Sequence, residues 1–354
     1  MRGKVWKRSR QPAVPLKSSK LVLLTGAGFT KSFGGYLSSE MWAVILGQPE
    51  IQLNLRLRQL LLDNSSFESL YETVSLSLDY LPVEKAAFTA AVKRAYGQMH
   101  EVVCGHWQLK VNEACGVIIS QFAPPSPTER GFFFTLNQDL VVEQYYYRVR
   151  QHLKAIPLRI PGLDNRDWFV SRRHVSVSHE DRIQLPGEAE VDKLKSQFWQ
   201  SSVEPFVYLK LHGSLGWKAT DGSDVMVIGQ NKNGMIDKEP FLRWQREVFK
   251  RVLKEGNCRL VVIGYGFGDV HINEILADAI HHNGLRLYIV SPLEPNNFKS
   301  WLHRDQNPLF PSDMIPKLWG GVFGYHFGTV EDLYVQGKWE LSKSGKTFFQ
   351  QVNL

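Results

Sequence analysis

A glycine-containing segment near the start of the chain has residue types that suit phosphate binding. Residues 21–24 are all apolar, and Gly26 and Gly28 follow them directly. Glycines allow backbone N–H groups to approach a phosphate closely, and a helix that begins there adds the positive end of its dipole. The same residues also fit an ordinary tight turn between a strand and a helix, so both interpretations stay open. Lys31 stands where a dehydrogenase fingerprint has a third small residue, which argues against the usual geometry of hydride transfer.

Two more polar clusters follow apolar runs and hold residue types that can take part in catalysis. Asn137 and Asp139 come after residues 132–136, and His212 comes after residues 207–211. An asparagine amide can donate to and accept from a hydroxyl or a water without adding charge. A histidine suits the role of general base because its unperturbed pKa lies near neutral pH. The alternatives are that His212 merely ends a strand at a glycine turn and that Asp139 caps a helix.

The excess of basic residues is concentrated at the start of the chain. The sequence has 42 Lys and Arg residues against 35 Asp and Glu residues. Seven basic residues and no acidic residue fall within the first twenty positions, namely Arg2, Lys4, Lys7, Arg8, Arg10, Lys17 and Lys20. The rest of the chain is therefore balanced in charge. Residues 1–19, which also contain Pro12 and Pro15, are predicted to form a flexible arm that is solvated or bound to an acidic surface.

Composition excludes several classes of protein. Of the 354 residues, 43% are hydrophobic and 12% aromatic, which is typical of a globular chain. No apolar run reaches the length needed to span a bilayer. The first apolar run gives way to a glycine turn too soon for a secretory signal. Three scattered cysteines, Cys104, Cys115 and Cys258, fit a reducing compartment, so a cytoplasmic location without membrane contact is predicted.

The elements that position these residues alternate between strand and helix. Short apolar runs that predict buried strands occupy residues 21–24, 132–136, 207–211, 260–263 and 285–290. The pattern predicts an α/β fold with a doubly wound, Rossmann-like parallel sheet, in which ligands bind at the carboxyl ends of the strands. The predicted domain covers residues 20–295, with helical insertions at 37–122 and 155–205. Residues 296–354 are predicted to be a C-terminal extension packed on this domain.

Four clusters, each at the end of a predicted strand, resemble the sirtuin family in their order along the chain. They read TGAGFT at 25–30, FTLNQD at 134–139, LKLHG at 209–213 and IGYGFGDVHIN at 263–273. The resemblance is nearest to the sirtuin-like domains of bacterial antiphage defence proteins, and it covers roughly residues 20–295.

The chain also departs from the protein-deacylating sirtuins. Those enzymes carry a zinc ribbon of two Cys-x-x-Cys pairs after the asparagine cluster, whereas residues 140–257 contain no cysteine. The sequence therefore predicts no metal, and Cys104, His106 and Cys115 are interpreted as structural residues. Residues 35–39 also differ from the sirtuin Ile-Pro-x-Phe-Arg-like stretch, which puts acyl-lysine binding in doubt.

The resemblance implies a role for each of several residues. Asn137 is expected to position water and ribose, His212 to act as the base, and Asp139 to contact the nicotinamide side or to cap the next helix. The resemblance further implies contacts with NAD+ by Gly26, Ala27, Gly28, Thr30, Gly264, Tyr265, Gly266, Asp269 and Ser291. Three histidines on the predicted helix after residue 269 are interpreted as surface or interface residues, namely His271, His281 and His282.

The function implied by the resemblance is that of an NAD+ glycohydrolase, an enzyme that cleaves NAD+ to nicotinamide and ADP-ribose. The implied setting is abortive infection in antiphage defence, as a homo-oligomer with a HerA-type hexameric ATPase as partner. DNA is a second candidate partner for the basic arm. The alternatives are an NAD-dependent protein deacylase and a non-catalytic nucleotide-binding or nuclease subunit of a defence complex.

Overall fold

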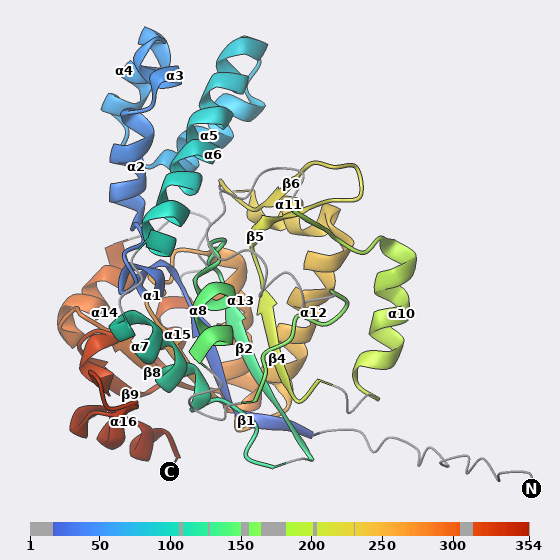
Figure 1. The fold of residues 1–354 in the computed structure, drawn as a ribbon, viewed down its shortest axis with the longest axis vertical. Coiled ribbons are helices and arrows are strands. Elements are labelled where there is room, and N and C mark those ends of the chain that lie inside the picture. The colour runs from blue at the N-terminus through green and yellow to red at the C-terminus, as the bar shows by residue number, and fades with distance from the viewer. Residues whose placement is uncertain are drawn as a thin grey trace, which may run out of the picture.

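Six strands form a parallel sheet at the centre of the molecule (Figure 1). The computed structural model describes residues 17–105, 109–126, 128–149, 156–163, 182–200, 204–229, 231–304 and 314–353. The strands of the sheet are β1 (Lys17–Thr25), β2 (Glu129–Thr135), β4 (Phe206–Lys210), β7 (Arg259–Ile263), β8 (Arg286–Ser291) and β9 (Val322–Phe327). All five strands predicted from the sequence are present, and β9 is an addition to them. The predicted doubly wound α/β fold is therefore confirmed.

The order of the strands creates a switch point next to the first strand. Across the sheet the order is β4-β2-β1-β7-β8-β9, so the chain builds outward from β1 in one direction and then returns to build from β7 in the other. This is the order of a dinucleotide-binding Rossmann sheet, in which the crevice lies outside the carboxyl ends of the two strands where the direction reverses. In this chain those two strands are β1 and β7.

Helices cover both faces of the sheet, and the side chains of β2 show which helix covers which face. Phe133 points to one face and contacts Phe29 of α1 (Ala27–Lys31) at 6.5 Å between ring centroids. Phe134 points to the other face and contacts Phe249 of α12 (Pro240–Lys254) at 4.8 Å. A strand that buries both of its faces reads as a continuous apolar run, which explains why this strand was readable from the sequence.

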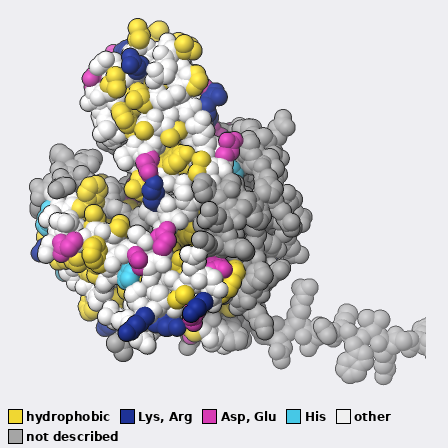
Figure 2. Space-filling model, turned by 60° about the vertical axis from the view of Figure 1, so that its left-hand side comes forward, with side chains coloured by type: hydrophobic (Ala, Val, Ile, Leu, Met, Phe, Trp, Pro, Cys, Tyr) yellow, Lys and Arg dark blue, Asp and Glu magenta, His cyan; other side chains and the backbone are white. Residues whose placement is uncertain are grey.

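A lobe of helices projects from the sheet between β1 and β2 (Figure 1). It contains α2 (Ser38–Leu46), α3 (Pro49–Gln52), α4 (Leu55–Asp63), α5 (Phe67–Leu76) and α6 (Pro82–Gly105), and α7 (Leu109–Ser120) leads back to β2. The predicted helical character of residues 37–122 is confirmed in the described part. Apolar side chains gather on the outside of this lobe (Figure 2), and the most exposed are Leu53 and Leu78.

The remaining elements lie between the later strands of the main sheet or after β9. A small second sheet is formed by β3 (Ile183–Gln184), β5 (Gly213–Lys218) and β6 (Asp224–Met226). The other helices before β9 are α8 (Val141–Val149), α10 (Glu188–Phe198), α11 (Lys232–Lys238), α13 (Val270–Asn283), α14 (Pro295–Arg304) and α15 (Met314–Gly320). After β9 come η2 (Glu331–Leu333), β10 (Tyr334–Val335), β11 (Glu340–Leu341) and α16 (Lys343–Asn353).

Two of the predicted boundaries differ from the structure. The predicted arm ends at residue 19, but β1 begins at Lys17, because Ser18 Oγ donates to Glu255 Oε1 at 2.9 Å and ties this segment to the end of α12. The predicted domain ends at residue 295, but β9 pairs with β8, so the C-terminal part supplies an edge strand of the main sheet. Residues 1–16 and 164–181, which belong to the predicted arm and second insertion, lie outside the described residues.

No helix in the described part of the chain combines the length and the apolar content that crossing a bilayer requires.

Candidate active site at the strand ends

The glycines after β1 allow two loops to touch at the switch point. Gly26 N donates to Ile263 O at 3.0 Å, and Gly28 N donates to Gly264 O at 2.9 Å. A Cβ on Gly28 would lie 2.7 Å from Gly264 Cα, and Gly264 itself has a positive φ of 67°. These glycines are therefore required by the close contact between the loops after β1 and β7, whatever ligand the loops hold.

Asn137 lies against the glycine loop after β1. Its Nδ2 donates to Gly26 O at 2.8 Å and to Thr30 Oγ1 at 2.7 Å. Thr30 Oγ1 in turn donates to Asp139 Oδ2 at 2.6 Å, and the other carboxylate oxygen of Asp139 accepts from Val141 N at 3.0 Å. Asp139 therefore caps α8 and also holds Thr30, so the helix-cap alternative from the sequence describes one of its two oxygens.

A buried ion pair stabilises the loop between β2 and α8, which contains Asn137 and Asp139. Lys210 Nζ donates to Glu143 Oε1 at 2.8 Å and also to the backbone carbonyl of Asp139, and its side chain is fully buried. Burial raises the pKa of the Glu143 carboxyl, and Lys210 opposes that shift. Tyr208 completes the group by donating its hydroxyl to Glu143 Oε2 at 3.3 Å. Lys210, at the end of β4, thus fixes the backbone of Asp139, two residues after Asn137.

His212, at the end of β4, is paired with a second histidine from the start of α13. The Nε2 atoms of His212 and His271 are 2.9 Å apart, and both side chains are buried. The ring centroids are 5.0 Å apart. This distance exceeds the separation of the two Nε2 atoms by about the radius of each ring, so the two nitrogens face each other almost along the line that joins the centroids. The interpretation of His271 as a surface or interface residue is wrong, because its side chain is buried against His212. His281 and His282, further along α13, are exposed as predicted.

A three-membered charge group lies beside the two histidines. Lys232, at the start of α11, contacts Asp269 Oδ1 at 2.6 Å and Glu68 Oε2 at 2.7 Å. Burial alone would raise the pKa of the Asp269 carboxyl, but Lys232 and the two imidazoles hold it well below its usual range. Asp269 is therefore ionised, and Glu68 connects this charge group to the helical lobe through α5.

Both histidines are neutral at neutral pH. Burial lowers the pKa of His212 to about 3; Asp269 opposes the shift, and Lys232 and His271 add to it. Burial also lowers the pKa of His271 to about 4; Asp269 again opposes, and Lys232, Arg246 and Lys250 lower it further. A neutral imidazole has a free lone pair, which is the form that a general base requires.

The family model described as "SIR2-like domain" matches residues 131–308, which is half of the chain. The chain belongs to the SIR2-like family. A comparison with curated proteins gives no match. The matched part includes Asn137, His212 and the loop after β7, while the glycine loop after β1 lies before it. Membership in this family is consistent with an NAD-dependent enzyme.

The other residues that the SIR2-like resemblance implicates in NAD+ binding occupy the loops after β7 and β8. Tyr265 is buried, and its hydroxyl lies 3.0 Å from Asn273 Oδ1, so it supports the loop from below. Gly266 O accepts from Trp301 Nε1 at 3.0 Å. Phe267 has a positive φ of 56°, a strained conformation of the kind that often marks a functional loop. Ser291, at the end of β8, accepts from Leu293 N at 3.2 Å.

A metal ion is one further possibility for this SIR2-like site. The ligand atoms of His212, His271 and Asp269 all lie within 4.8 Å of one another, which is close enough to surround a cation. The two imidazoles, however, point at each other and not at a shared third point, and Asp269 is already paired with Lys232. This arrangement is that of a hydrogen bond between two rings. Of the residues predicted to be structural, Cys115 is buried, and the side chains of Cys104 and His106 lie outside the described part.

Four residues near the site were not found by reasoning from the sequence. They are His271, Lys232, Glu68 and Tyr96, and the last of these comes from α6. Burial raises the pKa of Tyr96, Glu68 and Asp139 raise it further, and Lys232 lowers it, so its phenol lies among these charges. The only sequence signal among the four was the position of His271, two residues after Asp269 in the fourth cluster.

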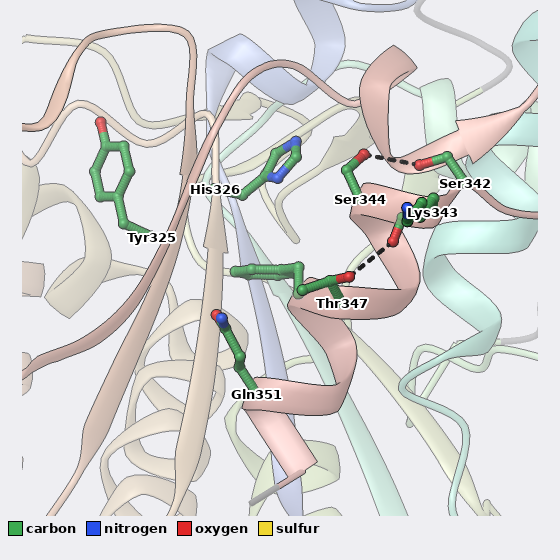
Figure 3. A pocket seen from close by; sticks show the side chains of 8 residues that line it. Tyr325, His326, Ser342, Lys343, Ser344, Thr347 and Gln351 are labelled. Carbon is green, nitrogen blue, oxygen red and sulfur yellow. Dashed lines mark hydrogen bonds between the residues drawn. The ribbon is translucent and has the colours of Figure 1, made fainter.

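Two cavities border the elements around the main sheet. One of about 420 Å³ borders His271 and is also lined by Asn233, Asp237, Arg246, Lys250, Lys254, Glu274, Ile275 and Asp278. The other, of about 620 Å³, lies between β9 and α16 (Figure 3). No predicted site residue lines either cavity, but the first is lined by His271, which contacts His212. In the second, Ser342 Oγ already accepts from Gly345 N at the start of α16, at 3.0 Å. The cavity beside His271 is therefore the one that bears on the site.

Proposed function

We propose that this SIR2-like chain is an NAD+ glycohydrolase that cleaves NAD+ to nicotinamide and ADP-ribose. The observation that carries the proposal is that Asn137 contacts the glycine loop at the switch point of a Rossmann sheet, while a neutral His212 follows β4 and contacts His271, at the start of the helix after β7. A dinucleotide at such a crevice has its phosphates near the loops after β1 and β7.

The chemistry needs few groups from the protein. Nicotinamide leaves NAD+ as a neutral molecule from a cationic ring, so no general acid is required. The transition state resembles an oxocarbenium ion, as in glycoside hydrolysis. The protein has to hold the ribose, exclude bulk water and place one water with a base beside it. The amide of Asn137 suits the first task, and the neutral imidazole of His212 suits the last.

The rival enzymatic function, protein deacylation, is disfavoured by the same chain. Residues 140–257 contain no cysteine that could build the zinc ribbon of the deacylating sirtuins. The second rival is a non-catalytic nucleotide-binding or nuclease subunit. Such a subunit makes no use of an asparagine and a neutral histidine that follow two neighbouring strands, β2 and β4.

The biological setting is part of the proposal. We infer that depletion of NAD+ serves antiphage defence by abortive infection, that the chain acts as a homo-oligomer, and that its partner is a HerA-type hexameric ATPase. The support for this setting is the sirtuin-like resemblance of the four sequence clusters. The basic residues before Lys17 and the exposed leucines of the helical lobe are two features of the chain on which such contacts can be tested.

The test is the consumption of NAD+ by the purified protein, alone and with its partner, with nicotinamide and ADP-ribose measured as products. Without an acyl-lysine acceptor, both products are expected in equal amounts. Asn137→Ala and His212→Ala should each lower turnover by about 10²-fold or more, since each removes a group that acts on the developing cation or the attacking water. His282→Ala is the matched control, because it removes an exposed histidine.

Three outcomes separate the rivals. Binding of NAD+ without consumption in any assembled state would favour a non-catalytic subunit. Consumption that depends on an acetylated peptide would favour the deacylase. Near-normal turnover in His212→Ala would show that another group is the base.

A further inference from the structure

The second histidine of the pair has no role in the function proposed so far. His271 contributes its Nε2 to a head-on contact with His212 Nε2, at 2.9 Å. Two neutral imidazoles can make this contact only if one ring donates an N–H and the other accepts with a lone pair. The contact therefore couples the two rings: the ring that donates is protonated on Nε2, and the ring that accepts is protonated on Nδ1. Either ring can be the donor, so two arrangements are possible.

In the first arrangement His271 donates to His212. His212 Nε2 is then occupied as an acceptor and its Nδ1 carries the proton, so the ring has no lone pair left for a substrate. In the second arrangement His212 donates its Nε2–H to His271, and its lone pair lies on Nδ1. No described residue bonds to His212 Nδ1. Only the second arrangement leaves His212 able to accept a proton.

We propose that His271 is the positioning residue that sets the tautomer of His212: His271 Nε2 accepts the Nε2–H of His212 and leaves the basic lone pair on His212 Nδ1. This inference rests on the proposed function, because it takes His212 to be the base. It is the role that the second group plays in catalytic pairs in which one ring nitrogen is held so that the other can react.

The proton balance of the reaction fits this arrangement. When the bond between nicotinamide and ribose breaks, its electron pair goes to the ring nitrogen of nicotinamide. The oxygen of the attacking water bonds to the ribose carbon, and His212 Nδ1 takes one proton from that water. The resulting imidazolium keeps its Nε2–H on His271 and lies beside the ionised Asp269. After the products leave, Nδ1 releases the proton to bulk water, so each turnover yields one proton.

The cavity beside His271 makes the proposal testable from outside the site. His271 lines a cavity of about 420 Å³, and His212 does not. Removing the His271 side chain should therefore connect this cavity to the space next to His212 Nε2. A free imidazole that enters there can accept the Nε2–H in place of the missing side chain.

Three substitutions at one position separate positioning from packing. In His271→Gln the side-chain oxygen can take the place of Nε2 as an acceptor. His271→Leu keeps a similar volume and removes the acceptor. His271→Ala opens the space for imidazole. Circular dichroism and thermal unfolding establish which variants fold, and His282→Gln is the control for loss of an exposed histidine elsewhere on α13.

The first measurement is the tautomer of His212, read from the ¹⁵N chemical shifts of its ring in the full chain without NAD+. We expect an Nε2-protonated ring in the wild type and in His271→Gln, and a changed tautomer in His271→Leu. The second measurement is turnover of NAD+. We expect it to fall by about tenfold to a hundredfold in His271→Leu and His271→Ala, to recover in His271→Gln, and to recover in His271→Ala when imidazole is added.

An Nδ1-protonated His212 in the wild type would overturn the inference, as would an unchanged tautomer and turnover in His271→Leu. One metal ion per chain that is lost in His271→Leu would also overturn it, since a metal would then hold both nitrogens. The tautomer is measured without NAD+, so it stands apart from the proposed function. If the tautomer responds as expected while no NAD+ is consumed, the proton placement holds and the proposed function fails.

Discussion

At the scale of single residues, the side chains proposed to act in this site are held by one another. Asn137 is bonded to the glycine loop and to Thr30, and His212 is bonded to His271. These bonds hold the side chains close to the positions from which they would act. Such preorganisation lowers the cost of arranging catalytic groups when substrate binds.

The two buried histidines also predict how stability depends on pH. Their pKa values fall from 6.5 in the unfolded chain to about 3 for His212 and about 4 for His271. Below pH 6.5 the unfolded chain binds protons that the folded chain does not, so the free energy of unfolding should fall as the pH drops from about 6.5 towards 4. Replacing His271 by Gln removes one of these groups and should make that fall shallower.

Urea unfolding at a series of pH values between 7 and 5 measures this effect. His282→Gln is the control, because the side chain of His282 is 63% exposed and its loss should leave the pH dependence as in the wild type. If His271→Gln loses as much stability over this range as the wild type, His271 is already protonated or exposed in the folded state.

At the scale of elements, five strands of the main sheet could be predicted from the sequence, and the edge strand β9 could not. The runs that became β1, β2, β4, β7 and β8 are apolar because both of their faces are covered by helices. β9 was missed because it is an edge strand that contains Gly324 and His326 and exposes Phe323 and Phe327, so it has no continuous apolar run.

The same reasoning explains which parts of the site were found. Asn137 and His212 directly follow buried strands, so the rule that parallel sheets bind ligands at the carboxyl ends of strands brought them together. His271 was missed because the apolar stripe of α13 marks the helix face that packs on the sheet, while the first turn is buried by the strand ends instead. Glu68 comes from the first insertion and Lys232 from α11, and neither directly follows a strand of the main sheet, so only the structure places them.

The bridge from α5 through Lys232 to Asp269 predicts an effect on the histidines. Lys232 lowers the pKa of both rings, so Lys232→Met should raise both pKa values. A base that protonates more readily is lost at a higher pH, so the acid limb of NAD+ consumption should move to higher pH. The measurement is the pH profile of turnover, together with the pKa of each ring from ¹⁵N chemical shifts.

Two further variants guard this prediction against trivial explanations. Lys238→Met changes an exposed lysine on the same helix and should leave the profile unchanged. Glu68→Gln keeps the contact between Lys232 and Asp269 and should shift the profile less than Lys232→Met does. An acid limb that stays in place in a folded Lys232→Met protein would show that the cation does not act on the histidines.

At the scale of the whole molecule, charge divides the chain into a balanced body and a basic start. Five of the seven unbalanced basic residues precede Lys17: Arg2, Lys4, Lys7, Arg8 and Arg10. The main sheet begins at Lys17, which is the register partner of Glu129 in the parallel pairing of β1 with β2. Lys20 Nζ donates to Glu255 O at 2.8 Å. The structure therefore sets a clean limit for a deletion, because residues 2–16 can be removed without touching β1.

Deleting residues 2–16 should leave NAD+ consumption by the isolated chain intact, because every residue of the proposed site lies after β1 in the chain. The deletion should weaken assembly, since we expect the basic segment to bind an acidic surface on a neighbouring subunit or on the ATPase partner. Gel filtration with and without the partner, and with and without duplex DNA, measures this.

A variant that keeps residues 2–16 but has the five basic residues replaced by glutamine separates charge from chain length. If charge is the cause, both variants should lose assembly to the same extent, and in the wild type assembly should weaken as salt is raised. Unchanged assembly together with lost, salt-sensitive DNA binding would instead assign the basic segment to nucleic acid.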